Sequence, residues 1–124
     1  MAKNLVVIRT DSSVKIGNGH MMRCLTLAEE LISRDYEVLF LCRLIEAHLV
    51  DLLSNKGIEL SLIDLPEYVG DSIESLWSDY EQSRDAEKCQ NILKGREVKA
   101  LIVDHYGLNA VWERFLSGVS DKVM

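Results

Sequence analysis

The sequence predicts an α/β fold in which a parallel sheet carries helices on both faces. Four short apolar runs rich in β-branched residues, helical patterns between them and tight connections are the observations that predict it. A strand covered on both faces shows a continuous apolar run, whereas a covering helix shows apolar residues at intervals of three and four. Four such units with tight connections therefore predict one parallel, doubly wound sheet with right-handed crossovers.

The expected elements alternate along the chain. The strands span residues 5–8, 37–42, 58–63 and 100–104. Three helices span residues 20–33, 45–53 and 109–116, and another lies within residues 72–93. Gly57 is expected to end the second helix, and Asn109 to cap the fourth. We expect the first strand to lie beside the fourth. The loops that follow these two strands then flank the crevice where such sheets bind ligands.

Composition narrows the class of function. The 124 residues suffice for one domain with a hydrophobic core. A net charge of −6 argues against nucleic acid and anionic membranes as partners, because both demand a cationic face. The first apolar run is too short for a signal peptide and no stretch resembles a membrane span, so we predict a cytoplasmic protein. Three cysteines in apolar stretches predict buried thiols rather than disulfides or zinc ligands.

Three further expectations concern the rest of the chain. The acidic run 74–87 is expected to be a solvated helix face, and Trp77 and Trp112 are expected to make core or interdomain contacts. Residues 120–124 look like a turn that enters a fifth strand. We therefore expect residues 1–124 to form one domain of a truncated chain.

A glycine-rich loop, residues 9–20, joins the first strand to the first helix. Gly17 and Gly19 let the backbone approach a ligand closely, and the amide groups at the helix start favour an anion. The dinucleotide fingerprint requires a third glycine where Met22 stands, and an acidic residue after the second strand, where Arg43 stands. The P-loop sequence is also missing. We therefore predict neither NAD nor FAD, and no other cofactor.

His20 is the strongest candidate for a catalytic residue. A histidine at a helix amino terminus is kept neutral by the helix dipole, and a neutral imidazole can take a proton from water. The alternative is a histidine that only caps the turn. The charge of Arg23 interacts unfavourably with the same dipole unless a nearby anion compensates it. Asp11, Asp104 or a ligand phosphate could be that anion. Arg9, at the end of the first strand, has the same structural and ligand-binding interpretations.

A second polar segment, residues 104–107, follows the fourth strand and belongs to the same crevice. Asp104 can orient a histidine or Arg23, and Tyr106 offers a sugar a stacking face and a hydroxyl. The alternative is structural: Asp104 caps the turn, His105 is solvated and Tyr106 packs at the rim. The residues alone leave both interpretations open.

Together the two segments resemble a known family. Residues 9–24 follow the pattern R-T-D-S-S-x-x-I-G-x-G-H-x-x-R-C, and residues 104–107 are D-H-Y-G. This combination is similar to the UDP-2,4-diacetamido-2,4,6-trideoxy-β-L-altropyranose hydrolases of pseudaminic acid biosynthesis, which are related to spore-coat polysaccharide enzymes and GT-B glycosyltransferases. The resemblance implies the amino-terminal, Rossmann-like half of a GT-B fold. It also implies a carboxyl-terminal domain, missing here, that holds most of the UDP.

The resemblance further implies the chemistry. His20 would activate water, the water would attack the anomeric carbon, and UDP would leave without a metal. UDP is a good leaving group, so one base can suffice where ordinary glycosidases need two carboxylates. The predicted contacts to the UDP-sugar are Arg9, Asp11, Gly17, Asn18, Gly19, Arg23, Asp104, His105 and Tyr106.

Two alternatives to the hydrolase stay open. A GT-B glycosyltransferase would use the same half-fold, with a sugar hydroxyl in place of water. A fragment that lacks the second domain would have no activity of its own. Nothing in these residues separates hydrolase from transferase.

Overall fold

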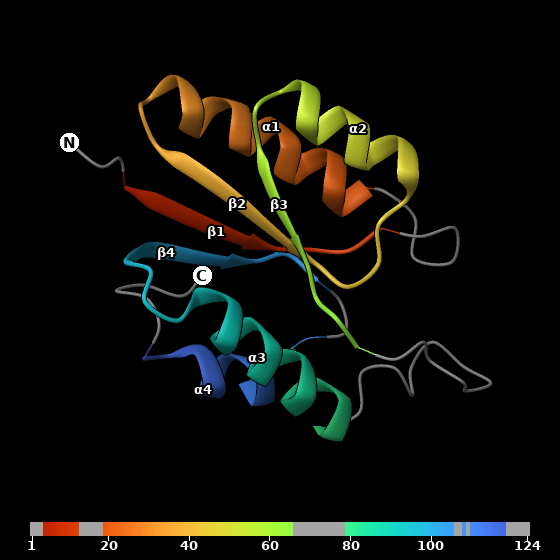
Figure 1. Cartoon of the computed structure of the whole chain (residues 1–124), viewed down its shortest axis with the longest axis vertical. Helices are drawn as coiled ribbons and strands as arrows, with labels where there is room; N and C mark the ends of the chain where they lie inside the picture. The colour runs from red at the N-terminus through yellow and green to blue at the C-terminus, as the bar shows by residue number, and fades with distance from the viewer. Residues whose placement is uncertain (1–3, 13–18, 66–78, 106–107, 109, 119–124) are drawn as a thin grey trace.

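The computed structural model describes residues 4–12, 19–65, 79–105, 108 and 110–118 (Figure 1). Strands and helices alternate along this part of the chain: β1 (Leu5–Arg9), α1 (Gly19–Ser33), β2 (Glu37–Cys42), α2 (Ala47–Asn55), β3 (Glu59–Leu62), α3 (Asp79–Leu93), β4 (Val98–Val103) and α4 (Ala110–Leu116). The predicted α/β class with a parallel, Rossmann-like sheet is confirmed. Predicted and observed bounds differ by at most two residues, except that α3 begins at Asp79 and residues 72–78 lie outside the described residues.

The sheet has the strand order β3-β2-β1-β4, and every neighbouring pair is parallel. The predicted placement of the first strand beside the fourth is confirmed. Arg9 is paired with Val103, and the amide of Asp104 donates to the Arg9 carbonyl at 3.1 Å. The loops after β1 and β4 therefore leave the sheet side by side.

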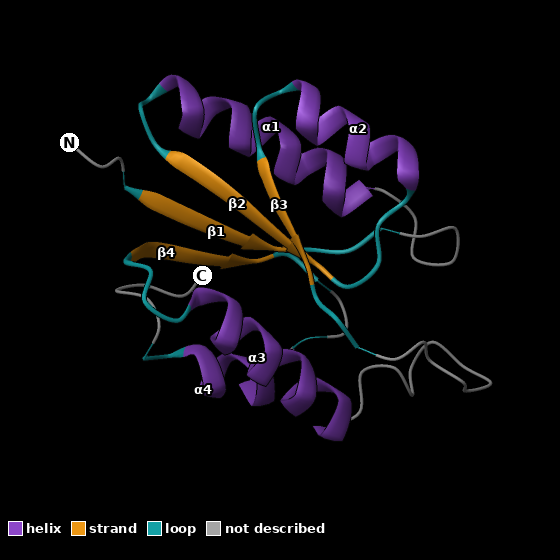
Figure 2. Cartoon of the chain, viewed as in Figure 1, coloured by secondary structure: helices purple, strands orange, loops and turns teal. Residues whose placement is uncertain are grey.

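Helices cover both faces of the sheet (Figure 2). α1 and α2 lie over Val6, Ile8 and Phe40, whereas α3 and α4 lie over Val7 and Leu39 on the opposite face. Successive side chains of a strand point to opposite faces, so the uninterrupted apolar run of β1 supplies both cores. This is the physical reason why a run without polar alternation predicts a two-sided sheet.

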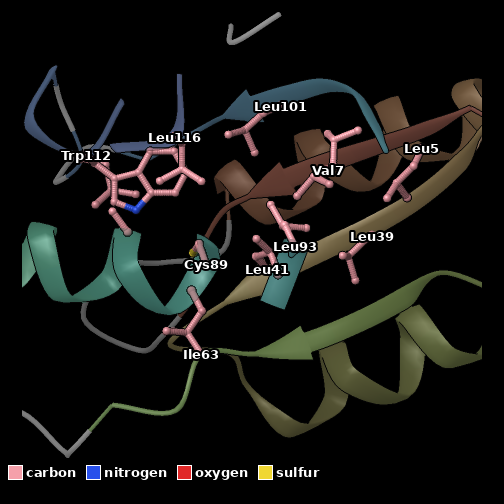
Figure 3. Close-up of a cluster of buried hydrophobic side chains, with 13 residues drawn as sticks. Leu5, Val7, Leu39, Leu41, Ile63, Cys89, Leu93, Leu101, Trp112 and Leu116 are labelled. Carbon is pink, nitrogen blue, oxygen red and sulfur yellow. The ribbon is translucent and has the colours of Figure 1, made fainter. Parts of the chain in front are cut away.

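Trp112 anchors α4 in the core between α3 and the sheet. Its side chain is fully buried and belongs to the same cluster as Cys89 of α3 and Leu101 of β4 (Figure 3). The indole Nε1 donates to Asp85 at 2.8 Å, so its polar atom is satisfied inside the core. The expected core contact is confirmed for Trp112, and Trp77 lies outside the described residues.

α2 ends in a left-handed turn at Gly57. This residue has a φ of +72°, a conformation that disfavours side chains by about 1 kcal/mol or more. The amide of Ile58 donates to the Leu53 carbonyl at 3.0 Å, which closes the end of the helix. The predicted helix stop is confirmed. The predicted cap at Asn109 and the predicted fifth strand after residue 119 lie outside the described residues.

The acidic run 74–87 is not uniformly a solvated face. In its described part, Gln82 and Asp85 are buried, with exposed fractions of 1% and 0%. The prediction is wrong for these two residues. α3 turns Asp85 towards Arg9 of the sheet, whereas the prediction depended on the rule that the side chains of an acidic run face water.

The cysteines Cys24, Cys42 and Cys89 are buried thiols, as predicted. Burial raises the pKa of the Cys24 thiol to about 12, and it raises the pKa values of the other two well above the ordinary range. At neutral pH all three are therefore protonated and weakly nucleophilic. Among the described residues, no helix combines the length and the apolar character that a membrane crossing demands.

Candidate active site at the carboxyl edge of the sheet

The carboxyl edge of the sheet brings together side chains that are far apart in the sequence. Residues 10–12 follow β1, Asp104 and His105 follow β4, and His20 lies in the first turn of α1. Since β1 and β4 are parallel neighbours, their ends meet at this edge, where sheets of this kind bind ligands. The two segments that the sequence singles out thus lie at one place.

His20 and Asp104 form a histidine–carboxylate pair. Nδ1 of His20 is in hydrogen-bond contact with Oδ1 of Asp104, and the two side chains are 15% and 20% exposed. Nδ1 also lies 2.9 Å from Nη2 of Arg23, which can only donate, whereas the carboxylate can only accept. In the tautomer that suits the contact with Asp104, Nδ1 carries the hydrogen and donates it to the carboxylate. In the neutral ring, Nε2 then carries the lone pair, which is the arrangement that a general base requires.

Arg23 binds the same carboxylate with two donors. Its Nε donates to Oδ2 of Asp104 at 3.0 Å and its Nη2 donates to Oδ1 at 2.7 Å. Partial burial would raise the pKa of Asp104, but hydrogen bonds from Arg23 and His20 outweigh it and lower the pKa to about 2. Asp104 is therefore an anion at neutral pH. It compensates the positive charge of Arg23 in the first turn of α1, which is one of the pairings that the sequence left open.

Asp11 and His105 form a second pair, deeper in the domain. Nε2 of His105 lies 2.8 Å from Oδ2 of Asp11, and the side chains are 3% and 0% exposed. Oδ1 of Asp11 accepts the amides of Arg43 at 2.7 Å and Leu44 at 3.1 Å. Burial would raise the pKa of Asp11, but the charge of Arg9 and the hydrogen bonds from His105 and Arg9 hold it well below its usual range. The alternative of a solvated His105 is wrong.

Arg9 is fully buried and joins this pair to α3. Its Nη1 donates to Asp11 at 2.8 Å, while its Nε and Nη2 donate to Asp85 at 3.1 and 2.6 Å. The structural interpretation of Arg9 accounts for these contacts, and a side chain without exposed surface does not support direct contact with a substrate. Sequence analysis did not find Asp85. The available signal was its place four residues before Cys89, a core position on the same helical stripe.

The remaining predicted contacts lie in or beside the glycine loop and after β4. Gly19 begins α1, its backbone is not left-handed, and among the described residues no atom lies within 4 Å of the Cβ that another residue would add. Among the described residues, neither the conformation nor the packing of Gly19 requires a glycine, and its predicted contact with a ligand stays a prediction. Gly17, Asn18 and Tyr106 lie outside the described residues.

Fold and site together define a Rossmann-like α/β domain with a histidine–carboxylate pair at the edge where such sheets bind ligands. Among curated proteins, the chain is similar to the UDP-2,4-diacetamido-2,4,6-trideoxy-β-L-altropyranose hydrolase of Campylobacter jejuni, with 29% identity over 111 residues. The match covers 90% of this chain and 31% of that protein, so the chain spans about a third of the relative's length. No protein-family model matches the chain, and no solved structure matches it.

Proposed function

We propose that this chain is the catalytic part of a UDP-sugar hydrolase that removes UDP from a UDP-linked diacetamido-trideoxy sugar. The observation that carries the proposal is the contact of His20 with Asp104 at the carboxyl edge of the sheet. The similarity to a curated hydrolase of this kind, over 90% of the chain, supports the substrate class. The released sugar would belong to pseudaminic acid biosynthesis.

In the proposed reaction, Asp104 holds the Nδ1–H of His20, so that the lone pair on Nε2 faces the attacking water. Nε2 takes one proton from the water while the water oxygen bonds to the anomeric carbon. The bond between that carbon and the UDP oxygen breaks, and its electron pair leaves with the diphosphate. The imidazolium that forms is stabilised by the ionised Asp104.

A single base suffices in this proposal because of the leaving group. Ordinary glycosidases protonate a poor leaving group with one carboxylic acid and use a second carboxylate as base or nucleophile. A diphosphate leaves without protonation, so the acid is not needed. Arg23, whose side chain is 67% exposed, lies beside the base and can stabilise negative charge that develops on the diphosphate.

Most of the UDP is proposed to bind to a carboxyl-terminal domain of the same protein, in the GT-B arrangement. Two observations support this part of the proposal. The match spans only 31% of the relative, which leaves length for a second domain. In addition, the arginines Arg9, Arg23 and Arg43 at this edge are each paired with a carboxylate, so a diphosphate needs further donors.

The decisive experiment compares His20→Ala with His48→Ala in the complete protein. His48 is a matched control because it lies on α2 with 63% of its side chain exposed and contacts Glu46 at 3.6 Å. UDP release from the UDP-linked diacetamido-trideoxy sugar is measured without any sugar acceptor. Loss of a general base should lower kcat by about 10²- to 10⁴-fold in His20→Ala, with UDP affinity retained, whereas His48→Ala should keep the native rate.

The outcomes separate the alternatives. Release of UDP with water alone supports hydrolysis, and release that needs a sugar acceptor supports a GT-B glycosyltransferase. Near-native hydrolysis by His20→Ala contradicts the assignment of His20 as the base.

A further inference from the structure

One face of α1 is attached to a single carboxylate of β4. His20, Arg23 and Cys24 are three and four residues apart, so they lie on the same side of the helix. All three side chains contact Asp104. In the part of the chain that the structure describes, no other side chain holds this carboxylate. The first turns of α1 and the end of β4 therefore meet at Asp104.

Arg23 is the residue that binds both oxygens of Asp104. Its Nε donates to Oδ2 at 3.0 Å and its Nη2 donates to Oδ1 at 2.7 Å. The thiol of Cys24, which is a weak donor, lies 3.5 Å from Oδ2. A planar guanidinium that binds both oxygens fixes the plane of a carboxylate, whereas a contact at one oxygen leaves the carboxylate able to rotate. Arg23 therefore sets the direction in which Oδ1 faces.

The direction of Oδ1 matters to His20. Nδ1 of His20 is in hydrogen-bond contact with Oδ1 of Asp104, and it lies 2.9 Å from Nη2 of Arg23. In the Nδ1–H tautomer both nitrogens donate to Oδ1, which is the one acceptor among these three atoms. If the carboxylate rotated, Nδ1–H would lose its acceptor and face the guanidinium, which is another donor.

Stability gives little reason for an arginine at this position. A cation in the first turn of a helix interacts unfavourably with the helix dipole. The side chain of Arg23 is 67% exposed, and ion pairs of such residues contribute little to the free energy of unfolding. A lysine would supply the same charge, so the feature that arginine adds is its planar pair of donors.

We propose that Arg23 is a positioning residue, which fixes the carboxylate of Asp104 and through it the Nδ1–H of His20. The inference rests on the proposed function, in which His20 is the base. It gives Arg23 a role in the site besides any contact with the diphosphate. It also assigns that role to the shape of the guanidinium and not to its charge.

The first test is ¹H–¹⁵N NMR of the 124-residue chain, labelled at histidine, at about pH 8, where an ordinary imidazole is neutral. The native chain should show a His20 Nδ1–H proton that exchanges slowly with water. Arg23→Lys keeps the charge but has one nitrogen on a flexible stem, so this exchange should become about tenfold faster. Arg34→Lys is the matched control, because Arg34 lies on the same helix, is 70% exposed and binds Glu30, and it should leave the exchange rate unchanged.

A second variant covers the case in which Arg23→Lys does not fold. Arg23→Gln removes the charge and the paired donors together, so it should also speed the exchange of the His20 proton. A native exchange rate in whichever of these variants folds overturns the inference. A native chain in which His20 carries its hydrogen on Nε2 overturns it as well.

Kinetics then separate this inference from the proposed function. In the complete protein, Arg23→Lys should lower kcat about tenfold with KM nearly unchanged, because a misoriented base affects the chemical step. A native kcat with a raised KM would mean that Arg23 acts through binding of the diphosphate, and it would overturn the inference. Faster exchange in Arg23→Lys together with near-native hydrolysis by His20→Ala would keep the link between Arg23 and the ring and contradict the proposed function.

Discussion

Replacement of Arg9 by methionine should destabilise this domain far more than loss of a surface arginine. The guanidinium makes five hydrogen bonds, to both Asp85 oxygens, to Asp11 and to the carbonyls of Thr10 and Leu41. Methionine fills much of the same volume and donates none of them. Two buried carboxylates would then lose their shared cation, and burial of uncompensated charge is among the most destabilising changes known for single residues.

The expected loss is about 3–5 kcal/mol in the free energy of unfolding. A domain of this size has a total of about 5–15 kcal/mol, so the variant approaches the limit of folding. At roughly 4 °C per kcal/mol, Tm should fall by about 12–20 °C. Arg34→Met is the matched control, because the Arg34 side chain is 70% exposed and pairs with Glu30 at the surface, and this substitution should cost about 0.5 kcal/mol.

Urea unfolding followed by circular dichroism measures both variants, with the midpoint and the slope compared separately. A double-mutant cycle with Asp85→Leu adds a sharper test. Arg9→Met should cost at least about 2 kcal/mol less in that background, since one of the two stranded carboxylates is already gone. A loss below about 1 kcal/mol for Arg9→Met alone, or equality with Arg34→Met, refutes the account of Arg9 as the centre of a buried charge cluster.

Two further predictions concern pH and thiol chemistry. The pKa of Asp104 is lowered to about 2, so its carboxylate stabilises the fold above its unfolded pKa, and this contribution is lost as pH falls from about 4 towards 2. Because the Arg23 side chain is largely exposed, we expect this contribution to the free energy of unfolding to be only about 1 kcal/mol. Urea unfolding should show that the native chain is more stable than Asp104→Asn above about pH 4 and that this difference shrinks towards pH 2. A difference that does not change with pH would contradict the prediction. A thiol reagent at neutral pH should leave Cys24, Cys42 and Cys89 unmodified until denaturant is added, and rapid labelling of the folded chain would show that a thiol is accessible.

The fold was predictable because one physical signal dominates each element. Residues 5–8 and 38–42 are continuous apolar runs, rich in β-branched residues in the first case, and short runs of this kind are typical of strands buried on both faces. Two further signals are local in the sequence: the apolar residues spaced three and four apart predict the helix α1, and Gly57, which is left-handed in the structure, predicts the end of α2. The expectation that the first strand lies beside the fourth came from the strand orders typical of doubly wound sheets rather than from any residue.

The partners within the site were harder to predict, because they depend on contacts between distant segments. The pairing of Arg23 with Asp104 was one of three that sequence analysis left open, because a cation in a first helical turn favours a nearby anion but does not identify it. The contact of Asp11 with His105 spans 94 residues and leaves no local pattern. Asp85 was assigned to solvent because a carboxylate in an acidic run normally faces water.

The end of β4 links the two histidine–carboxylate pairs. Asp104 and His105 are consecutive, yet the first contacts His20 of α1 and the second contacts Asp11 after β1. The amide of Asp104 is also tied to the Arg9 carbonyl, so a shift of β4 by a single residue would move a carboxylate and an imidazole to opposite sides. Register between β1 and β4 is therefore the property on which both pairs depend. Substitutions that loosen this register should disturb both pairs together, even where they lie far from either histidine.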